Sequence, residues 1–419
     1  MGMRGVYLLA ALVALNAERA MTAIIHVDDR EEGIRGAGSM ENPYRDLQTA
    51  IDEAGDGDTL LISPGQYVSQ RFSFREKLCG NCQEHITDVQ ASRGFLIENK
   101  GLTIIGSGRD STVLVTNAGY GVLFLRSYDS EISNLKITGG ARDLDGAATD
   151  AAVVVKWGRV TISQCLIADN TDRPDSVVVG IGGVMGREGT ELFIVENIIM
   201  NNTWDGVALY RGATAYIADN EINGGRGAGI GITWDAAAVV VRNRISNYWK
   251  GIGSFGDTRV VCSNNVVFDN LGWGIIATGT SYMDATNNVV YHNGNCGMAI
   301  WSDECTGRFS NNIVVENGWR EQWVCPCVGI WNYGNLFNFD ISYNNVWNNA
   351  AGGYGDMPDY SDRNGNTNLD PAFIDTDSFR LKAESPLIDK GNPLLSDPDG
   401  SNSDMGIYGG PRAIIQSGK

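Results

Sequence analysis

A repeat of about 23 residues constrains this chain more than any other feature of its sequence. Pairs of polar residues recur before an apolar pair, and their second members fall at Asn197, Asn220, Asn243, Asn265, Asn288, Asn312 and Asn345. Glycines recur with the same period, at Gly183, Gly206, Gly229, Gly251, Gly274, Gly297 and Gly329. In both series the last interval is longer than the others, which indicates an insertion in the same coil. Two columns that share a period and an insertion indicate stacked coils of a solenoid.

The content of each coil selects the type of solenoid. Each repeat holds three short runs rich in Val and Ile, separated by Gly and Asn. This unit is too short for a helical repeat, and the leucine spacing of leucine-rich repeats is missing. We therefore expect an all-β fold in which three parallel sheets wind around a stacked apolar interior. The Asn residues should stack about 4.8 Å apart and take the left-handed conformation at a corner.

Both ends of the chain carry further familiar segments. Near the start lie Ile24-Ile25-His26-Val27-Asp28, then a short helix with Leu47, Ala50, Ile51 and Ala54 on one side, and near the end lie Asp370-Pro371-Ala372-Phe373 and Ser385-Pro386-Leu387-Ile388-Asp389. With the repeat, these segments resemble the pectin-lyase-like superfamily of single-stranded right-handed parallel β-helices, over roughly residues 24–410. The resemblance implies that the helix caps the open end of the core. It also implies that the Gly-led strands form the first sheet, which commonly lines a substrate cleft. No specific catalytic family is identified, because the better-known lyase, polygalacturonase and epimerase signatures are not visible.

The sequence divides into five parts. Residues 1–17 read as an export signal, with Arg4 before an apolar run that is too short to span a bilayer. This signal predicts a secreted or extracytoplasmic protein. We expect the N-terminal strand and capping helix at 24–68, a Cys-containing loop insertion at 69–95, parallel β-helix coils at 96–350, and a C-terminal coil and cap at 351–419.

Charge and cysteine content limit the partners. The formal net charge of −18 disfavours nucleic acid and anionic membranes, and a strongly anionic glycan as well unless a local basic patch or a bridging cation reverses the field. In an exported chain, the eight cysteines predict a disulfide between Cys79 and Cys82 and two more among Cys296, Cys305, Cys325 and Cys327. Zinc beside His85 is the alternative. Cys165 and Cys262 should be buried free thiols.

Aromatic residues gather on one predicted face. Counting from each Gly, positions +1 and +3 are apolar and should face inward, as with Val207 and Leu209, so positions +2 and +4 should face outward. Flat rings beside polar groups suit sugar rings, whereas the alternative is that long turns bury them as a satellite core. The predicted substrate-binding residues are Tyr210, Arg211, Trp234, Trp249, Phe255, Trp273, Trp301, Trp331 and Tyr333.

Ionisable residues near this face suggest two chemistries. Asp235, Asp257 and Asp303 share position +6, where stacked carboxylates could form the acid and nucleophile of a glycoside hydrolase, or could simply be solvated turn residues. A lyase needs instead a base and a cation that neutralises a uronate. Lys250 is the best base candidate, with Arg226 and Asp205 nearby.

Calcium is the only cofactor that the sequence suggests, and no metal ligands are assigned. The segment Asp397-Pro398-Asp399-Gly400-Ser401-Asn402-Ser403-Asp404 resembles a calcium loop loosely but lacks the closing Glu, and a capping turn is the alternative.

These observations predict a secreted, monomeric, polysaccharide-active protein. An enzyme, either a glycoside hydrolase or a polysaccharide lyase, is favoured because charged and aromatic residues share one edge. The alternative is a non-catalytic glycan-binding or cell-surface structural β-helix protein.

Overall fold

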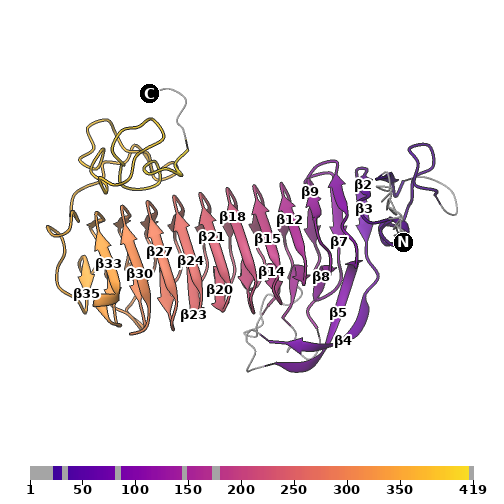
Figure 1. Ribbon diagram of the computed structural model, residues 1–419, viewed down its shortest axis with the longest axis horizontal. Coiled ribbons are helices and arrows are strands. Elements are labelled where there is room, and N and C mark those ends of the chain that lie inside the picture. Colours follow the sequence, from indigo (N-terminus) through magenta and orange to yellow (C-terminus); the bar gives the residue numbers. More distant parts are fainter. Residues whose placement is uncertain (1–21, 31–35, 81–85, 144–148, 172–179, 415–419) are drawn as a thin grey trace, which may run out of the picture.

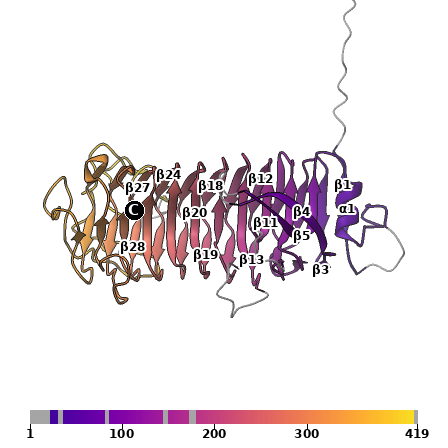
Figure 2. The ribbon, with the colours of Figure 1, turned by 90° about the horizontal axis from the view of Figure 1, so that it is seen from below.

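The chain winds into a right-handed parallel β-helix whose coils stack along one long axis (Figures 1 and 2). The structure is a computed structural model and describes residues 22–30, 36–80, 86–143, 149–171 and 180–414. The proposed export signal at 1–17 lies outside these residues. Over the coils each turn of the chain adds one strand to each of three sheets, named here sheets 1, 2 and 3 in the order in which a coil passes through them.

The bounds of the strands follow the repeat. Sheet 1 contains β4 (Phe72–Cys79), β5 (Thr87–Glu98), β8 (Tyr120–Leu125), β11 (Ala151–Lys156), β14 (Gly182–Arg187), β17 (Val207–Leu209), β20 (Ala228–Trp234), β23 (Lys250–Gly256), β26 (Trp273–Thr278), β29 (Met298–Ile300), β32 (Ile330–Asn332) and β35 (Tyr354–Gly355). Sheet 2 contains β1 (Ile24–Val27), β2 (Thr59–Ile62), β6 (Thr103–Gly106), β9 (Ser130–Ser133), β12 (Arg159–Ser163), β15 (Glu191–Val195), β18 (Thr214–Ala218), β21 (Ala237–Val241), β24 (Arg259–Ser263), β27 (Tyr282–Thr286), β30 (Thr306–Ser310) and β33 (Phe339–Ser342). Sheet 3 contains β3 (Gly65–Val68), β7 (Thr112–Val115), β10 (Lys136–Thr138), β13 (Leu166–Ala168), β16 (Ile198–Met200), β19 (Glu221–Asn223), β22 (Arg244–Ser246), β25 (Val266–Phe268), β28 (Val289–Tyr291), β31 (Ile313–Val315) and β34 (Asn345–Trp347). A 3-10 helix, η2 (Leu336–Asn338), precedes β33.

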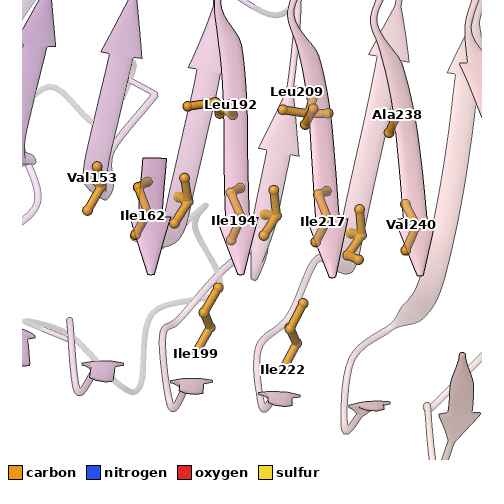
Figure 3. Close-up of a cluster of buried hydrophobic side chains, with 14 of the residues drawn as sticks. Val153, Ile162, Leu192, Ile194, Ile199, Leu209, Ile217, Ile222, Ala238 and Val240 are labelled. Carbon is orange, nitrogen blue, oxygen red and sulfur yellow. The ribbon is translucent and has the colours of Figure 1, made fainter. Parts of the chain in front are cut away.

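Alternate residues of each strand build the core. Ile194, Ile217 and Val240 are register partners on successive strands of sheet 2 and are fully buried, and Figure 3 shows them in one row. The predicted inward positions of sheet 1, among them Val207 and Leu209, are buried in the same core. Each coil therefore covers the apolar face of the next, and the stack supplies the hydrophobic stabilisation that one coil lacks.

A ladder of Asn side chains runs along the corner between sheets 2 and 3. The side-chain oxygen of Asn243 accepts the backbone N–H of Asn220 at 3.0 Å, and that of Asn265 accepts the N–H of Asn243 at 2.9 Å. This confirms the predicted stacking. The ladder's last steps differ from the prediction, because Asn312 donates to Asn344 and not to Asn345, which begins β34.

The corner also corrects the role expected for asparagine. The left-handed conformation lies at the residue before each ladder Asn, for example Glu196 with φ 58° and Arg242 with φ 56°. The ladder hydrogen bonds hold this backbone even where the residue is not Asn. A second ladder, through Asn270, Asn293, Asn317 and Asn349, lines the corner between sheets 3 and 1.

The N-terminal end of the core is capped as expected. Helix α1 (Leu47–Glu53) begins at Asp46, whose side chain accepts the N–H of Thr49, and it buries Leu47, Ala50 and Ile51 against the first coils.

Residues 69–95 differ from the loop that the sequence predicted. Within them, β4 and most of β5 form an antiparallel hairpin, and the end of β5 continues in parallel with β8. The hairpin buries Cys79, Val89 and Ala91 against outward residues of sheet 1, and Figures 1 and 2 show it lying across the N-terminal part of that sheet. The alternating apolar residues of segment 69–95 pack on the outer face of sheet 1, and for this reason the segment forms a hairpin and not an open loop.

The C-terminal segment does not cap the end of the coils as predicted. After the last coil it folds back along the side of the helix, where Figure 1 shows it in yellow. The side chains of Asn264 and Asn287 donate to backbone oxygens of residues 404–409, and Phe379, Leu387 and Met405 pack on outward residues of sheet 3. Its apolar residues are thus buried against an outer face and not against the open end of the core.

The structure holds Cys296, Cys305, Cys325 and Cys327 as free thiols and not as the two predicted disulfides. Cys296 and Cys325 interact with each other through their side chains. Cys305 bonds instead to Ser281 and Gly279 at the sheet 1 to sheet 2 turn, and Cys327 bonds to the backbone of Arg320. Cys165 and Cys262 are buried free thiols, as predicted. Cys79 is buried near Thr149, whereas Cys82 and His85 lie outside the described residues.

Within the part of the chain that the structure describes, no helix is long and apolar enough to cross a membrane.

Candidate functional site

A pocket of about 420 Å³ opens on the outer face of sheet 1, over β17, β20 and β23. Six residues assigned to the site from the sequence line it, and they are Tyr210, Arg226, Trp234, Trp249, Lys250 and Phe255. The rest of the lining is Trp204, Asp205, Gly227, Ala228, Gly231 and Thr233. Both the turn before each strand and the strand itself therefore contribute to the site.

The repeat places Asp205 and Lys250 in one column. Each directly precedes a column glycine, as does Ala228 on the coil between them, and Ala228 is the register partner of Lys250. The methyl group of Ala228 leaves the space between the two longer side chains open. The sequence placed Asp205 near Lys250 but gave it no role, although its place in this column was readable from the spacing.

Asp205 is a buried carboxyl group with few partners. Its Oδ1 accepts the backbone N–H of Ala228 at 2.6 Å, and its Oδ2 accepts the hydroxyl of Tyr210 at 3.4 Å. Burial raises the pKa of Asp205 to about 6, although the Ala228 N–H, the charge of Lys250 and the Tyr210 hydroxyl oppose this shift. A carboxyl group with such a pKa exchanges its proton close to neutral pH.

Lys250 sits among aromatic rings at the other side of the pocket. Its Nζ lies 4.6 Å from the ring centre of Phe255 and 5.9 Å from that of Trp273. Burial lowers the pKa of Lys250, and the charge of Asp205 opposes this effect. A desolvated amine of this kind is a stronger candidate for a base near neutral pH than a surface lysine.

Tyr210 and Arg226 complete the polar lining. Burial raises the pKa of Tyr210 well above its usual value, and the charge of Asp205 adds to the effect. Tyr210 is therefore a neutral phenol, and its hydroxyl donates a hydrogen bond to Asp205. The guanidinium of Arg226 contributes a positive charge to the lining. A carboxylate of a substrate would bind to such a charge.

The three aspartates of position +6 lie outside this pocket. Asp235, Asp257 and Asp303 are exposed at the turns between sheets 1 and 2, and Asp235 accepts the backbone N–H of Gly212 at 2.7 Å. This contact is that of a turn residue. The pocket lining contains one carboxylate, Asp205, so the structure does not bring a pair of carboxylates together there.

Arg211 is not available at the surface as the sequence suggested. It is buried beneath the β4–β5 hairpin, where its guanidinium donates to the backbone oxygen of Leu78 at 2.6 Å and pairs with Glu188. The same cluster holds Glu76 between Lys156 at 2.6 Å and Arg187 at 2.9 Å. Three basic and two acidic side chains leave an excess of one positive charge behind Tyr210.

The predicted aromatic row is present, but its members differ in exposure. Trp273 and Trp331 are buried in a satellite core with Ile276, Ala299 and Cys325, and Trp331 donates to Asp356. Trp234 and Tyr333 are exposed by 39% and 67%, and Trp301 lies between Trp273, Trp331 and Tyr333 in edge-to-face and tilted contacts. The satellite-core interpretation thus holds for Trp273 and Trp331, whereas sugar contact stays a prediction for the exposed members. Of the predicted row, Trp234, Trp249, Phe255 and Tyr210 line the pocket.

The residues that the structure describes do not fit a metal centre. Across the described ranges, no group of three or more His, Cys, Asp or Glu side chains could hold a metal ion. Ca²⁺ prefers six to eight oxygen ligands, and the pocket offers a single carboxylate. In the segment compared with a calcium loop, Asp397 accepts the backbone N–H groups of Asp404 and Gly410, which is the bonding of a structural turn.

Comparison with known proteins agrees with this architecture. The sequence model of the family described as "right handed beta helix region" matches residues 78–237 and 180–346. A curated mouse protein (Mus musculus), SHC SH2 domain-binding protein 1, is 21% identical over 233 residues, which are 56% of this chain. The match spans 27% of that protein's length.

Two solved structures share the fold at low sequence identity. Pectate lyase Pel9A has a TM-score of 0.50 and 15% identity, over 93% of this chain and 97% of that one. The A-module of the Azotobacter vinelandii mannuronan C-5 epimerase AlgE4 has a TM-score of 0.54 and 13% identity, over 79% of this chain and 95% of that one. Likeness at this level of identity describes the fold alone.

Proposed function

Since the chain belongs to the family of right-handed β-helix regions, we propose that its pocket over β17, β20 and β23 binds an anionic glycan and removes a proton from it. The observation that carries the proposal is that Lys250 and Asp205 both line one pocket, where burial shifts the pKa of each toward neutrality. Shifted groups that share a pocket are a signature of acid–base sites.

The composition of the lining favours elimination over hydrolysis. A glycoside hydrolase normally uses two carboxylates that flank the glycosidic bond. The pocket has one carboxylate, Asp205, together with an amine, a guanidinium and a phenol. This set fits the removal of a proton from a sugar carbon next to a carboxylate, with Lys250 as base.

The proposed reaction assigns a role to each group. The Lys250 amine accepts the proton from C5 of a uronate ring, and Arg226 stabilises the negative charge that grows on the uronate carboxylate. The electron pair of the C5–H bond forms the C4–C5 double bond as the C4–O bond breaks. The leaving oxygen takes up a proton, for which the Tyr210 hydroxyl is the proposed donor. Asp205 acts on the base, because its charge raises the pKa of Lys250. Trp234 and Trp249 would hold the sugar ring.

The net charge of −18 disfavours an anionic glycan, but the charge near the pocket is locally positive. Lys250 and Arg226 line the pocket, and the buried cluster behind Tyr210 adds an excess positive charge. With Asp205 as the one carboxylate of the lining, the basic side chains in and behind the pocket outnumber the acidic ones, and such a local excess attracts an anion whatever the sum over the surface. The names of the two proteins of similar fold, a pectate lyase and a mannuronan C-5 epimerase, support a uronate substrate, since pectate and mannuronan carry a carboxylate on each ring.

The test is a product screen with the purified protein. Polygalacturonate, alginate and a neutral glucan are each incubated with the chain, and the unsaturated product is followed by its ultraviolet absorbance and the new reducing ends by a colour reaction. We expect both signals together on a polyuronate. New reducing ends without the absorbance would indicate a hydrolase, and retention on a glycan without product would indicate the non-catalytic alternative. We propose with this activity that the protein acts outside the cytoplasm, and the export signal predicted at residues 1–17 supports this location.

A further inference from the structure

We infer that the pocket accepts the end of a glycan chain or a short oligosaccharide and excludes the interior of a long chain. This inference rests on the proposed function and concerns the same site. It is carried by what covers the outer face of sheet 1 on either side of the pocket.

One outward column of sheet 1 shows where this face is open. The residues are register partners on successive strands, and they run Leu123, Val154, Met185, Ala208, Gly231, Gly253, Ile276, Ala299 and Trp331. Glycine occupies two neighbouring positions of this run, and larger residues occupy the others. Gly231 lines the pocket, whereas the ring of Phe255 covers Gly253, so the floor of the pocket is a gap over Gly231.

The β4–β5 hairpin closes the N-terminal side of the gap. Cys79, Val89 and Ala91 of the hairpin pack on the column, so that Met185 and Ala208 are 4% and 2% exposed. Tyr210 belongs both to this packed cluster and to the lining of the pocket, and it forms the boundary between them. The hydrogen bond from Arg211 to the backbone of Leu78 ties the hairpin to the same coil.

The aromatic satellite core closes the other side. Ile276 and Ala299 are 2% and 0% exposed beneath Trp273, Trp331 and neighbouring residues. Trp323 packs edge-to-face on Trp249 with ring centres 5.1 Å apart, and Arg320 lies 5.0 Å from the centre of the Trp249 ring. The ring of Phe255 lies over Gly253, since a Cβ added there would meet its atoms at 2.7 and 2.8 Å.

The length of the gap limits the ligand. From the coil of Tyr210 to the coil of Phe255 the chain advances by two strand spacings, or about 10 Å. An internal stretch of a polysaccharide would have to leave the pocket at both ends, and packed side chains of the hairpin and of the aromatic satellite core block these two ends. A chain end or a short oligosaccharide needs only the opening above Gly231.

The experiment is a calorimetric titration with galacturonate and mannuronate oligomers, from the disaccharide to the hexasaccharide and beyond to the polymer. We expect the affinity to stay within about threefold from the trisaccharide to the hexasaccharide, and one protein to bind per chain at every length. Affinity that climbs steadily with length, or several proteins bound along one long chain, would overturn the inference and leave the proposed function standing. Absence of binding by every oligomer would overturn both.

A filled pocket provides the second measurement. A Cβ at Gly231 would meet the Ala228 Cβ at 3.5 Å and an oxygen of Asp205 at 3.9 Å, both ordinary contacts, so Gly231→Val should fold. We expect it to weaken trisaccharide binding by about tenfold or more, because its methyl groups occupy the floor. Ala237→Val, on sheet 2 of the same coil, is the matched control and should bind normally. Unchanged trisaccharide binding by folded Gly231→Val would overturn the inference.

Discussion

The hydroxyl of Tyr210 lies 3.4 Å from the carboxylate of Asp205, at the point where a packed satellite core ends and the pocket begins. Tyr210 and the backbone N–H of Ala228, which donates at 2.6 Å, together hold Asp205, and Tyr210 lies between Asp205 and the satellite core beneath the β4–β5 hairpin. Asp205 in turn faces Lys250 across the small side chain of Ala228. The predictions below follow from these contacts.

At a pH above its own pKa, Asp205 should lower the stability of the folded protein. Its ordinary pKa is 3.8, and burial raises it to about 6 in the folded state. Between these values the folded chain keeps a proton that the unfolded chain has lost, so the free energy of unfolding falls as pH rises and the loss is complete above about pH 6. Asp205→Asn removes this effect. The free energy of unfolding of the wild type relative to that of the variant should be lower at about pH 7 than at about pH 4, by about 2 to 3 kcal/mol. Urea denaturation at the two pH values measures it, and an unchanged difference would contradict the raised pKa.

Asp205 should also set the pH dependence of the reaction. The charge of Asp205 raises the pKa of Lys250 against the effect of burial, and the proposed base must be deprotonated. Removing the charge in Asp205→Asn should therefore move the rising limb of the pH–rate profile toward lower pH. A limb that stays in place or moves upward would show that Lys250 is not the group that titrates. Asp235→Asn, in an exposed turn outside the pocket, is the control and should leave the profile unchanged.

The buried charge cluster should be sensitive to the loss of a single acid. Glu76 is 4% exposed and pairs with both Lys156 and Arg187, whose charges outweigh burial and lower its pKa. Glu76→Gln leaves both cations without their shared counter-charge, and we expect a loss of about 3 to 5 kcal/mol in the free energy of unfolding. Glu191→Gln, which breaks an exposed pair with Arg159, should cost less than about 1 kcal/mol. Equal losses in the two variants would contradict the buried arrangement.

The Asn ladder should contribute strongly to stability at each step. The Asn243 amide accepts two hydrogen bonds from Asn220 and donates to Ile217, Val241 and Asn265. Asn243→Ala leaves buried donors and acceptors unsatisfied, and we expect a loss of about 2 to 4 kcal/mol by thermal or urea unfolding. Asn223→Ala removes a side chain that bonds Ser246 at the surface of sheet 3, and its cost should be clearly smaller.

The period of the sequence was enough to predict the coils, the stacked core and the first ladder, because every coil repeats the same contacts. The assignment of Asn345 to the ladder failed because it followed the second residue of an Asn pair, whereas Tyr343 takes the left-handed position and Asn344 follows it. The spacing of Asn270, Asn293, Asn317 and Asn349 follows the same period, so the second ladder is also predictable from the sequence.

The predictions that failed at the site concern contacts between distant parts of the chain, and a repeating sequence pattern does not predict such contacts. Arg211 was expected to bind substrate, but it bonds Leu78, which lies 133 residues earlier in the chain. Trp331 was expected at an outward position of its strand and Trp273 in the turn before its glycine. Trp273 instead begins β26, and the insertion that contributes Cys325 and Val328 covers both rings. The column of Asp235, Asp257 and Asp303 was read from position alone, and position does not distinguish a catalytic carboxylate from a turn residue.

The claim on which the functional account depends is that Lys250 removes the proton. It is tested most directly by comparing the formation of the unsaturated product from a uronate oligosaccharide by the wild type, Lys250→Met and Asp257→Asn, each shown to be folded by its unfolding temperature. We predict that Lys250→Met loses about a hundredfold or more of the rate, and that Asp257→Asn keeps the wild-type rate. A Lys250→Met variant that retains the wild-type rate, or an Asp257→Asn variant that loses it, would contradict the account.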